Sequence, residues 1–190
     1  PRPETEELVR WIVEAGPGER HPKRILDIGT GSGCIALAIK KAIPDSEVHA
    51  MDVSEAALQI AHTNAMEQGV EVCFHQADVC KPEDNWPCFD LLVSNPPYVP
   101  FREKENLDRH VRDSEPHLAL FVPEGDPLKV YRCICDFAEK YLRPGGDVCV
   151  EIHKDYGPEV VNLFEQHGLT DVVLKKDIFG RDRFVRGRKS

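Results

Sequence analysis

The sequence predicts an α/β protein with a seven-stranded, mostly parallel sheet that carries helices on both faces and ends in an antiparallel hairpin. Short runs rich in Val, Ile and Leu alternate with longer segments of helical periodicity, which is the pattern of β-α units in a parallel sheet. The last two strand-like runs are joined by a short loop, so we expect them to pair at the sheet edge. A chain of 190 residues is of ordinary size for one core, and we expect a single domain over residues 1–190.

The first half of the chain supplies three helices and three strands. Gly16 and Pro17 follow an amphipathic segment and end its helix. Ser54 is expected to cap a later helix, which Gly69 closes. In chain order the expected elements are a helix at 5–13, a strand at 24–28, a helix at 33–42, a strand at 47–51, a helix at 55–69 and a strand at 70–75.

The second half contains one short and one very long connection. The polar stretch before the fourth strand holds Pro82 and Pro87, so a helix there is brief or absent. Residues 95–125 are dense in proline and charge, and loops of that length in a compact domain are usually functional. Asp126-Pro127 is expected to cap and open a helix. The expected elements are a strand at 89–93, a helix running to residue 142, a strand at 147–152, a helix at 158–167 and a hairpin of 171–175 with 183–186.

The charge and hydropathy of the chain narrow the function. A net charge of −9 argues against strong binding to nucleic acid, which requires neutralising phosphates with Lys and Arg. Residues 175–190 are an exception, with seven basic residues against two acidic ones. This basic strip is either a solvated terminal strand or a weak RNA contact. No stretch is long and apolar enough to be a membrane span, and the N-terminus has no signal-peptide pattern.

The cysteines indicate a reducing compartment, which we take to be the cytoplasm. Seven cysteines are present, an odd number without a C-x-x-C pair, and most fall in apolar stretches as reduced, buried thiols do. A zinc site can be assembled from Cys73, His75, Cys80 and Cys88, but these residues lack the paired spacing of such sites. We therefore expect no metal.

A glycine-rich turn follows the first strand. Glycine there permits positive φ and lets a ligand lie against bare N–H groups at the start of a helix. The turn alone does not identify the ligand, because Gly31 to Ala36 also fits the G-x-G-x-x-A fingerprint of dinucleotide sites. The expected cofactor contacts in this turn are Asp27, Gly29, Thr30, Gly31, Ser32 and Gly33.

Two acidic residues at strand ends complete the expected cofactor site. Asp52, followed by Val53, ends the second strand, where a carboxylate accepts hydrogen bonds from an adenosine ribose in either cofactor class. Each such bond contributes roughly 1.5–3 kcal/mol. Asp78 is expected near the adenine amino group, with Val79 against the ring. The alternative is that both carboxylates only stabilise turns.

The sequence Asn95-Pro96-Pro97-Tyr98 ends the fourth strand and decides between the cofactor classes. Hydride transfer has no use for it, whereas methyl transfer to an amide or aromatic amine does. Such a nitrogen is nearly non-basic, so positioning must replace deprotonation. The Asn95 side-chain oxygen and the Pro96 carbonyl can accept both N–H bonds of an NH2 group and stabilise the charge that develops on nitrogen.

The remaining residues of this sequence support the same chemistry. Proline fixes φ and withholds a donor, so the carbonyl stays accepting toward the site. Tyr98 offers a flat face to the planar amide and a cation–π contribution of roughly 0.5–2 kcal/mol near a sulfonium. We therefore predict a methyltransferase that uses S-adenosylmethionine, with Asn95, Pro96 and Tyr98 in catalytic roles and residues 95–98 at the substrate.

At this point the sequence resembles the HemK family of protein-(glutamine-N5) methyltransferases. The resemblance covers nearly the whole chain and rests on residues 1–6, 27–33, 95–98, 115–116, 119–120, 176–177 and 180–183. It implies a class I, Rossmann-like methyltransferase fold and transfer to the glutamine of the Gly-Gly-Gln motif in class I peptide chain release factors. It also implies that residues 29–33, Asp52 and Asn95 bind S-adenosylmethionine, leaving S-adenosylhomocysteine.

The resemblance leaves alternatives open. The family carries a helical, substrate-seating domain before the catalytic one, and this chain starts without it. His153 stands where the family more often has glycine. The 99–125 segment is a plausible lid, with Glu115 either an anchor or purely structural. The rival functions are an adenine-N6 methyltransferase acting on DNA or RNA, and a cofactor-binding or release-factor-docking module without turnover.

Overall fold

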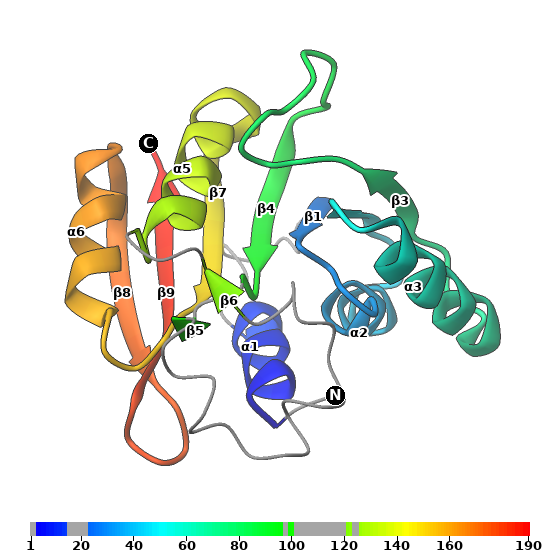
Figure 1. Ribbon diagram of the computed structural model, residues 1–190, viewed down its shortest axis with the longest axis horizontal. Helices are drawn as coiled ribbons and strands as arrows, with labels where there is room; N and C mark the ends of the chain where they lie inside the picture. The colour runs from blue at the N-terminus through cyan, green and yellow to red at the C-terminus, as the bar shows by residue number, and fades with distance from the viewer. Residues whose placement is uncertain (1–2, 15–22, 97–98, 101–120, 123–125) are drawn as a thin grey trace.

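The computed structural model describes residues 3–14, 23–96, 99–100, 121–122 and 126–190. A seven-stranded sheet runs in the order β3-β2-β1-β4-β7-β9-β8, and β5 and β6 form a separate two-stranded sheet (Figure 1). The elements are α1 Pro3–Glu14, β1 Arg24–Ile28, α2 Cys34–Ala42, β2 Glu47–Asp52, α3 Glu55–Gln68, β3 Cys73–Gln76, β4 Phe89–Ser94, β5 Val99–Pro100, β6 Phe121–Val122, α5 Lys129–Tyr141, β7 Leu142–Glu151, α6 Gly157–Gln166, β8 Leu169–Lys176 and β9 Asp182–Lys189.

The strand directions confirm the predicted fold class. β1 pairs in parallel with β2 and β4, β2 pairs in parallel with β3, and β4 pairs in parallel with β7. β9 is antiparallel to both β7 and β8, so the predicted C-terminal hairpin is confirmed. Because β9 lies between β7 and β8, the latter runs in the same direction as the parallel strands. The carboxyl ends of β4, β7 and β8 therefore meet at one edge of the sheet.

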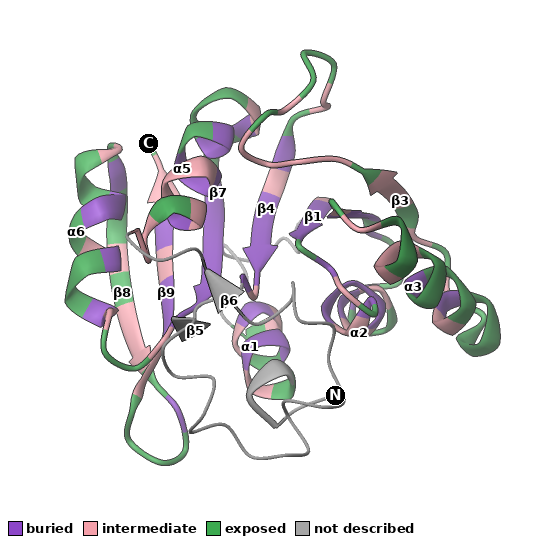
Figure 2. Cartoon of the chain, in the orientation of Figure 1, coloured by how far each residue is buried: buried purple, intermediate pink, exposed green. Residues whose placement is uncertain are grey.

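Helices cover both faces of the sheet, and the core has two halves. Ile25 of β1 packs with α1 and α2 on one face, whereas its neighbour Leu26 packs in the cluster that includes α5 and α6 residues on the other. β1, β4 and residues 146–151 of β7 are largely buried on both faces, which explains their apolar runs (Figure 2). Within the described residues, no helix combines the length and apolarity that a membrane span requires.

Several predicted boundaries are wrong by a few residues, and local hydrogen bonds explain two of them. β3 begins at Cys73 rather than at 70, because the Val70 N–H still donates to Ala65 O at the end of α3. The helix expected to begin after Asp126 begins at Lys129, since the Asp126 carboxylate stabilises a preceding turn by accepting the Leu128 N–H at 3.2 Å.

β1 has the predicted bounds, and the other elements agree with the prediction in type but differ in length. The predicted caps of α3 are confirmed: Ser54 accepts the Ala57 N–H at 3.3 Å and Gly69 is left-handed. β7 starts at Leu142, so it includes the Pro144-Gly145-Gly146 stretch that was expected to precede it. The differences leave the strand order and the sheet edge unchanged. In the structure α1 is 3–14, α2 34–42, β2 47–52, β4 89–94, α6 157–166, β8 169–176 and β9 182–189.

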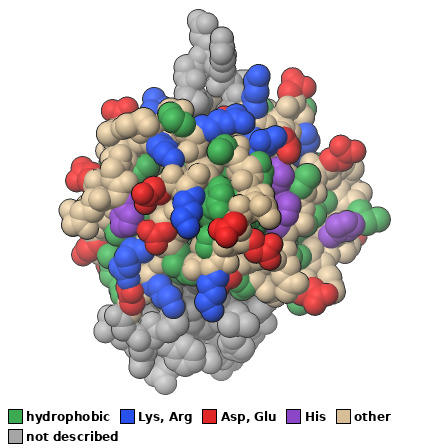
Figure 3. All heavy atoms as spheres, turned by 90° about the horizontal axis from the view of Figure 1, so that it is seen from above, with side chains coloured by type: hydrophobic (Ala, Val, Ile, Leu, Met, Phe, Trp, Pro, Cys, Tyr) green, Lys and Arg blue, Asp and Glu red, His purple; other side chains and the backbone are tan. Residues whose placement is uncertain are grey.

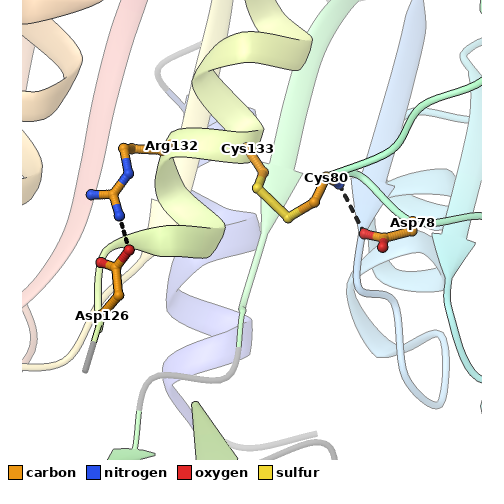
Figure 4. The surroundings of a disulfide bond; sticks show 5 residues. All are labelled: Asp78, Cys80, Asp126, Arg132 and Cys133. Atoms are coloured by element: carbon orange, nitrogen blue, oxygen red, sulfur yellow. Dashed lines mark hydrogen bonds and ion pairs between the residues drawn. A yellow bond between two sulfur atoms is a disulfide. The ribbon is translucent and has the colours of Figure 1, made fainter. Parts of the chain in front are cut away.

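The expectation of seven reduced thiols is wrong. Cys80 and Cys133 form a disulfide that joins the segment after Asp78 to α5 (Figure 4). The bond closes a loop with a sequence separation of 53 residues, and nothing in the local sequence around either cysteine announces its partner. Because Cys80 is bonded to Cys133, its thiol is not available as a metal ligand. The other five cysteines are free.

The basic strip at residues 175–190 is largely engaged within the protein. Arg188 binds Asp147 through Nε at 2.9 Å and Nη2 at 3.1 Å. The Lys189 ammonium donates to the carbonyls of Ala138, Glu139 and Leu142 at the end of α5, where positive charge is favoured. These contacts explain basic residues of the strip by their roles within the fold. A weak RNA contact stays a prediction.

Candidate active site

The register of three adjacent strands places the predicted site residues side by side. Ile28 of β1 pairs with Met51 of β2 and with Ser94 of β4. The next residues along these strands are Gly29, Asp52 and Asn95, which therefore share one row at the carboxyl edge of the sheet. Neighbouring strands are about 4.8 Å apart, so the glycine turn lies between a carboxylate and an amide. This edge is where open α/β sheets bind ligands.

The glycine turn leaves open space where other residues would have side chains. Gly29 and Gly31 have φ of +70° and +55°, and a Cβ built on either meets no atom within 4 Å. Gly33, with φ of +84°, differs because its Cβ would lie 3.1 Å from Ala61 Cβ of α3. The first two glycines thus provide conformation and room for a ligand, and the third permits close packing.

The expectation that a ligand accepts hydrogen bonds from free backbone N–H groups of this turn is wrong for four of its residues. Their N–H groups already donate to acceptors within the protein. The N–H groups of Gly29 and Thr30 both donate to Met51 O, at 2.9 and 3.0 Å. The Gly31 N–H donates to Asp52 Oδ2 at 2.9 Å, and the Gly33 N–H donates to Thr30 O. A diphosphate cradle needs such donors to be available. These four N–H groups are therefore not available to a ligand in this conformation.

Asp27 is a carboxylate buried beneath the turn. It is 0% exposed, and its Oδ2 accepts the Thr30 hydroxyl at 2.6 Å and the Ala36 N–H at 3.1 Å. Its Oδ1 is buried and has no hydrogen-bond partner among the described residues. Burial raises the pKa of Asp27 from 3.8 to about 7, the two hydrogen bonds oppose this, and the charge of Asp52 adds to it. A cationic group of a ligand near the turn would stabilise the ionised form of this buried carboxylate.

Asp52 anchors both sides of the turn while remaining partly exposed. Its Oδ2 accepts the Gly31 N–H and its Oδ1 accepts the Ser54 N–H, each at 2.9 Å. Each carboxylate oxygen can accept a second hydrogen bond, so ribose hydroxyls can still bind there. Val53 beside it is 61% exposed and offers an apolar surface to an adenine ring.

Asp78 and Val79 follow β3 at the same edge. The Asp78 Oδ1 atom accepts the Cys80 N–H at 2.9 Å, which closes a turn next to the disulfide. The Asp78 carboxylate stabilises this turn. Because it is also partly exposed, it remains accessible to an amino group of a ligand. Val79 packs against the apolar cluster beneath α5. Contact of these two residues with an adenine ring stays a prediction.

The predicted catalytic residues are only partly described. Asn95 is half-buried and Pro96 is buried, directly after β4. Pro97, Tyr98, Glu115 and most of the expected lid lie outside the described residues. Val99–Pro100 and Phe121–Val122 pair in parallel, so these two short stretches of the 99–125 segment lie together.

Two residues that support the site were missed in the sequence. The buried Ser94 hydroxyl donates to Ile28 O at 2.7 Å and joins the ends of β4 and β1. The signal for Ser94 was a hydroxyl in the last position of an apolar strand. Asn64 of α3 donates through Nδ2 to Ser32 O at 2.9 Å and so holds the turn from a distant helix. No local pattern predicts that contact.

Electrostatics favour a cationic ligand at this edge. Asp27 and Asp52 lie at the turn and already repel each other, and Asp78 follows β3 at the same edge of the sheet. A dinucleotide would bring a negatively charged diphosphate to these carboxylates, whereas S-adenosylmethionine brings a sulfonium and an ammonium. The residues present therefore fit S-adenosylmethionine.

We expect Asp52→Ala to weaken cofactor binding by roughly 10- to 100-fold, since it removes a charged acceptor for the ribose hydroxyls. The variant also removes the acceptor of the Gly31 N–H, so the turn itself becomes less ordered. Calorimetric titration with S-adenosylmethionine measures the change. Asp45→Ala, at an exposed position before β2, is the matched control. An unchanged dissociation constant in Asp52→Ala would contradict this placement.

Comparisons with known sequences agree on one family. A family model described as "Methyltransferase small domain" matches residues 6–119. The chain is 46% identical over 190 residues to a release factor glutamine methyltransferase of Bacteroides thetaiotaomicron, covering 100% of this chain and 67% of that protein. A protein of the same name from Streptococcus pneumoniae is 42% identical over 187 residues, covering 97% of this chain and 65% of its own length. The chain spans about two thirds of the length of these relatives.

Solved structures share the fold. The Thermus thermophilus 16S rRNA N2 G1207 methyltransferase RsmC, in complex with AdoMet and guanosine, superposes with a TM-score of 0.70 at 20% identity, covering 100% of this chain and 44% of its own. A ribosomal protein L11 methylase from Lactobacillus delbrueckii gives 0.69 at 19% identity, covering 98% and 79%. The fold is that of class I methyltransferases, and the sequence resemblance is confirmed at the level of the family. The chain belongs to the release factor glutamine methyltransferases.

Proposed function

We propose that this chain transfers a methyl group from S-adenosylmethionine to the N5 atom of the glutamine side chain in the Gly-Gly-Gln motif of class I peptide chain release factors. The observation that carries the proposal is the row of Asp52, Gly29 and Asn95 on three adjacent strands. In this row the Asp52 carboxylate, which can accept hydrogen bonds from a cofactor, and the Asn95 side chain, which can accept one from an amide, lie on the two sides of the glycine turn. Residues 1–190 would form the catalytic unit.

The proposed cofactor contacts follow from the geometry of the row. When bound, S-adenosylmethionine supplies an electrophilic methyl group on a sulfonium. Asp52 would accept the ribose hydroxyls, Val53 and Val79 would contact the adenine, and Asp78 would accept its amino group. The buried carboxylate of Asp27 would stabilise the positive charge of the cofactor from beneath the turn.

Asn95 and Pro96 would hold the substrate nitrogen. Their oxygens accept its two N–H bonds, which orients the lone pair and stabilises the charge that forms during transfer. Ser94 fixes the end of β4 to β1 and so keeps these acceptors in register with the turn. Pro97 and Tyr98 would complete the pocket around the planar amide, as the sequence predicts.

Labelled methyl transfer tests the function and its two rivals. With tritiated S-adenosylmethionine, a bacterial class I release factor should be labelled, and changing the glutamine of its motif to alanine should abolish the label. Mass spectrometry should locate one methyl group on that glutamine. Label found only in DNA or RNA would favour the adenine methyltransferase, and binding without any label would favour the docking module.

We place the activity in the cytoplasm, where release factors act on ribosomes. The Cys80–Cys133 bond does not follow from that location, because cytosolic proteins keep most thiols reduced. Thiol titration of denatured protein measures the state of the pair, since five of the seven cysteines are free when the bond is present.

A further inference from the structure

The turn at residues 177–181, between β8 and β9, holds two apolar side chains in solvent. Ile178 is 73% exposed and Phe179 is 68% exposed. Single exposed apolar residues are common on protein surfaces. Two adjacent exposed apolar residues at the tip of a projecting hairpin are less usual and form a small apolar patch. We call residues 177–181 the hairpin tip.

A buried aspartate holds the hairpin tip in one conformation. The Asp177 carboxylate accepts the N–H groups of Phe179 and Arg181 through Oδ1, both at 2.9 Å, and Arg183 Nε through Oδ2 at 3.3 Å. Burial alone would raise the pKa of Asp177, but these donors outweigh it and hold the pKa below its ordinary value. Gly180, with φ of +77°, closes the turn by donating to Asp177 O. The apolar pair is therefore presented in an ordered turn.

The hairpin tip projects from the same sheet edge as the catalytic row. Asn95 follows Ser94, which pairs with Val150, and the row continues through Glu151 and Phe184 to Lys175 of β8. Ile178 lies three residues beyond Lys175. With strands about 4.8 Å apart and about 3.3 Å per residue, the tip is roughly 17 Å from Asn95. Figure 1 shows the turn extending past the sheet on the side toward which the β4 arrow points.

That position matters for a macromolecular substrate. A folded domain is about 30 Å across, so one that presents an amide at Asn95 also lies over the hairpin tip. A short peptide around the same amide does not reach it. By contrast, the opposite edge of the sheet, at the amino ends of the parallel strands, shows basic and acidic side chains intermixed (Figure 3).

Charge indicates what the hairpin tip would meet. Lys176 Nζ forms an ion pair with Asp182 Oδ1 at 3.3 Å, so its charge is balanced within the hairpin. The Arg181 guanidinium lies 6.0 Å from the centroid of the Phe179 ring. The tip is thus a pair of apolar side chains with the cationic Arg181 beside them. Phe179 could stack on a base, but RNA is the less suitable partner because the chain has a net charge of −9.

We propose that the hairpin tip docks into an apolar recess with acidic neighbours on the folded protein whose glutamine is methylated. Ile178 and Phe179 enter the recess, and Arg181 contacts its acidic rim. This docking rests on the proposed function and adds a recognition surface outside the catalytic row. It distinguishes a whole release factor from its isolated motif.

The double variant Ile178→Ser with Phe179→Ser tests the proposal, because it changes exposed side chains and leaves Asp177 in place. The kinetics of methyl transfer are measured on an intact release factor and on a short Gly-Gly-Gln peptide. We expect KM for the release factor to rise about tenfold, with kcat and the peptide kinetics unchanged. Met66→Ser, at an apolar residue that is 72% exposed on α3, is the matched control and should leave both substrates unaffected.

The outcomes separate the docking from the function. If the wild type methylates both substrates and the double variant matches it on the release factor, the docking is wrong. Equal losses on peptide and release factor would also overturn it, since they indicate damage to the catalytic row. A loss of RNA binding, measured by fluorescence anisotropy, without an effect on the release factor would assign the tip to nucleic acid. Absence of methyl transfer by the wild type on either substrate contradicts the proposed function itself.

Discussion

Asn95→Ala should reduce the rate of methyl transfer by about 10²- to 10³-fold while changing the cofactor dissociation constant much less. The Asn95 oxygen is proposed to accept an N–H bond that strengthens as charge develops on the substrate nitrogen. Losing it therefore raises the barrier more than it weakens ground-state binding. Single-turnover assays at saturating cofactor measure the first effect, and calorimetry measures the second.

The control for this experiment is Asn85→Ala, which removes the same side chain from an exposed position before β4. It should have wild-type kinetics. Because Asn95 is half-buried at a strand end, thermal unfolding of both variants must be compared first. An Asn95→Ala enzyme that folds and transfers methyl groups at the wild-type rate would refute the proposed positioning of the amide.

Asp27→Asn should stabilise the cofactor-free protein above pH 7 and weaken its binding of S-adenosylmethionine by more than tenfold. The pKa of Asp27 is raised from 3.8 to about 7 in the folded protein. Between these values the folded state retains a proton that the unfolded state has lost, so the free energy of unfolding falls as pH rises. Three pKa units correspond to about 4 kcal/mol, fully lost above pH 7.

Asparagine does not ionise, so the variant escapes this loss. Its amide N–H groups would occupy the position of Oδ1, which has no partner among the described residues, and that opposes about 1–3 kcal/mol of the gain. We expect a net gain of roughly 1–3 kcal/mol at pH 8 and a smaller difference at pH 5. Denaturant unfolding at the two pH values measures it, and equal pH dependence in variant and wild type would show that Asp27 is not the titrating group.

The sequence predicts the row of site residues better than it predicts how the turn is built. Asp52 ends one parallel strand and Gly29 and Asn95 directly follow two others, so these residues come together because register follows from the buried pattern of each strand. The destination of the N–H groups of the turn could not be predicted. It depends on Met51 O and Asp52, which lie on another strand at a distance that only the folded sheet defines.

The remaining errors have the same origin in tertiary contacts. Asp126 is a residue type that commonly caps helices, but it stabilises a turn that comes first, so the helix begins only at Lys129. The apolar context around Cys133 resembles that of any buried thiol, and only the packing of α5 against the segment after β3 brings it to Cys80. Local pattern fixes the type of an element, whereas its ends depend on neighbours that are distant in sequence.

The disulfide also makes part of the chain a covalent ring. β4 and Asn95 lie inside the ring that Cys80 and Cys133 close, whereas the glycine turn lies outside it. A protease that cuts once between the two cysteines therefore leaves both fragments of the backbone attached to each other. On a denaturing gel the nicked protein would run as one species until a reductant separates it into two.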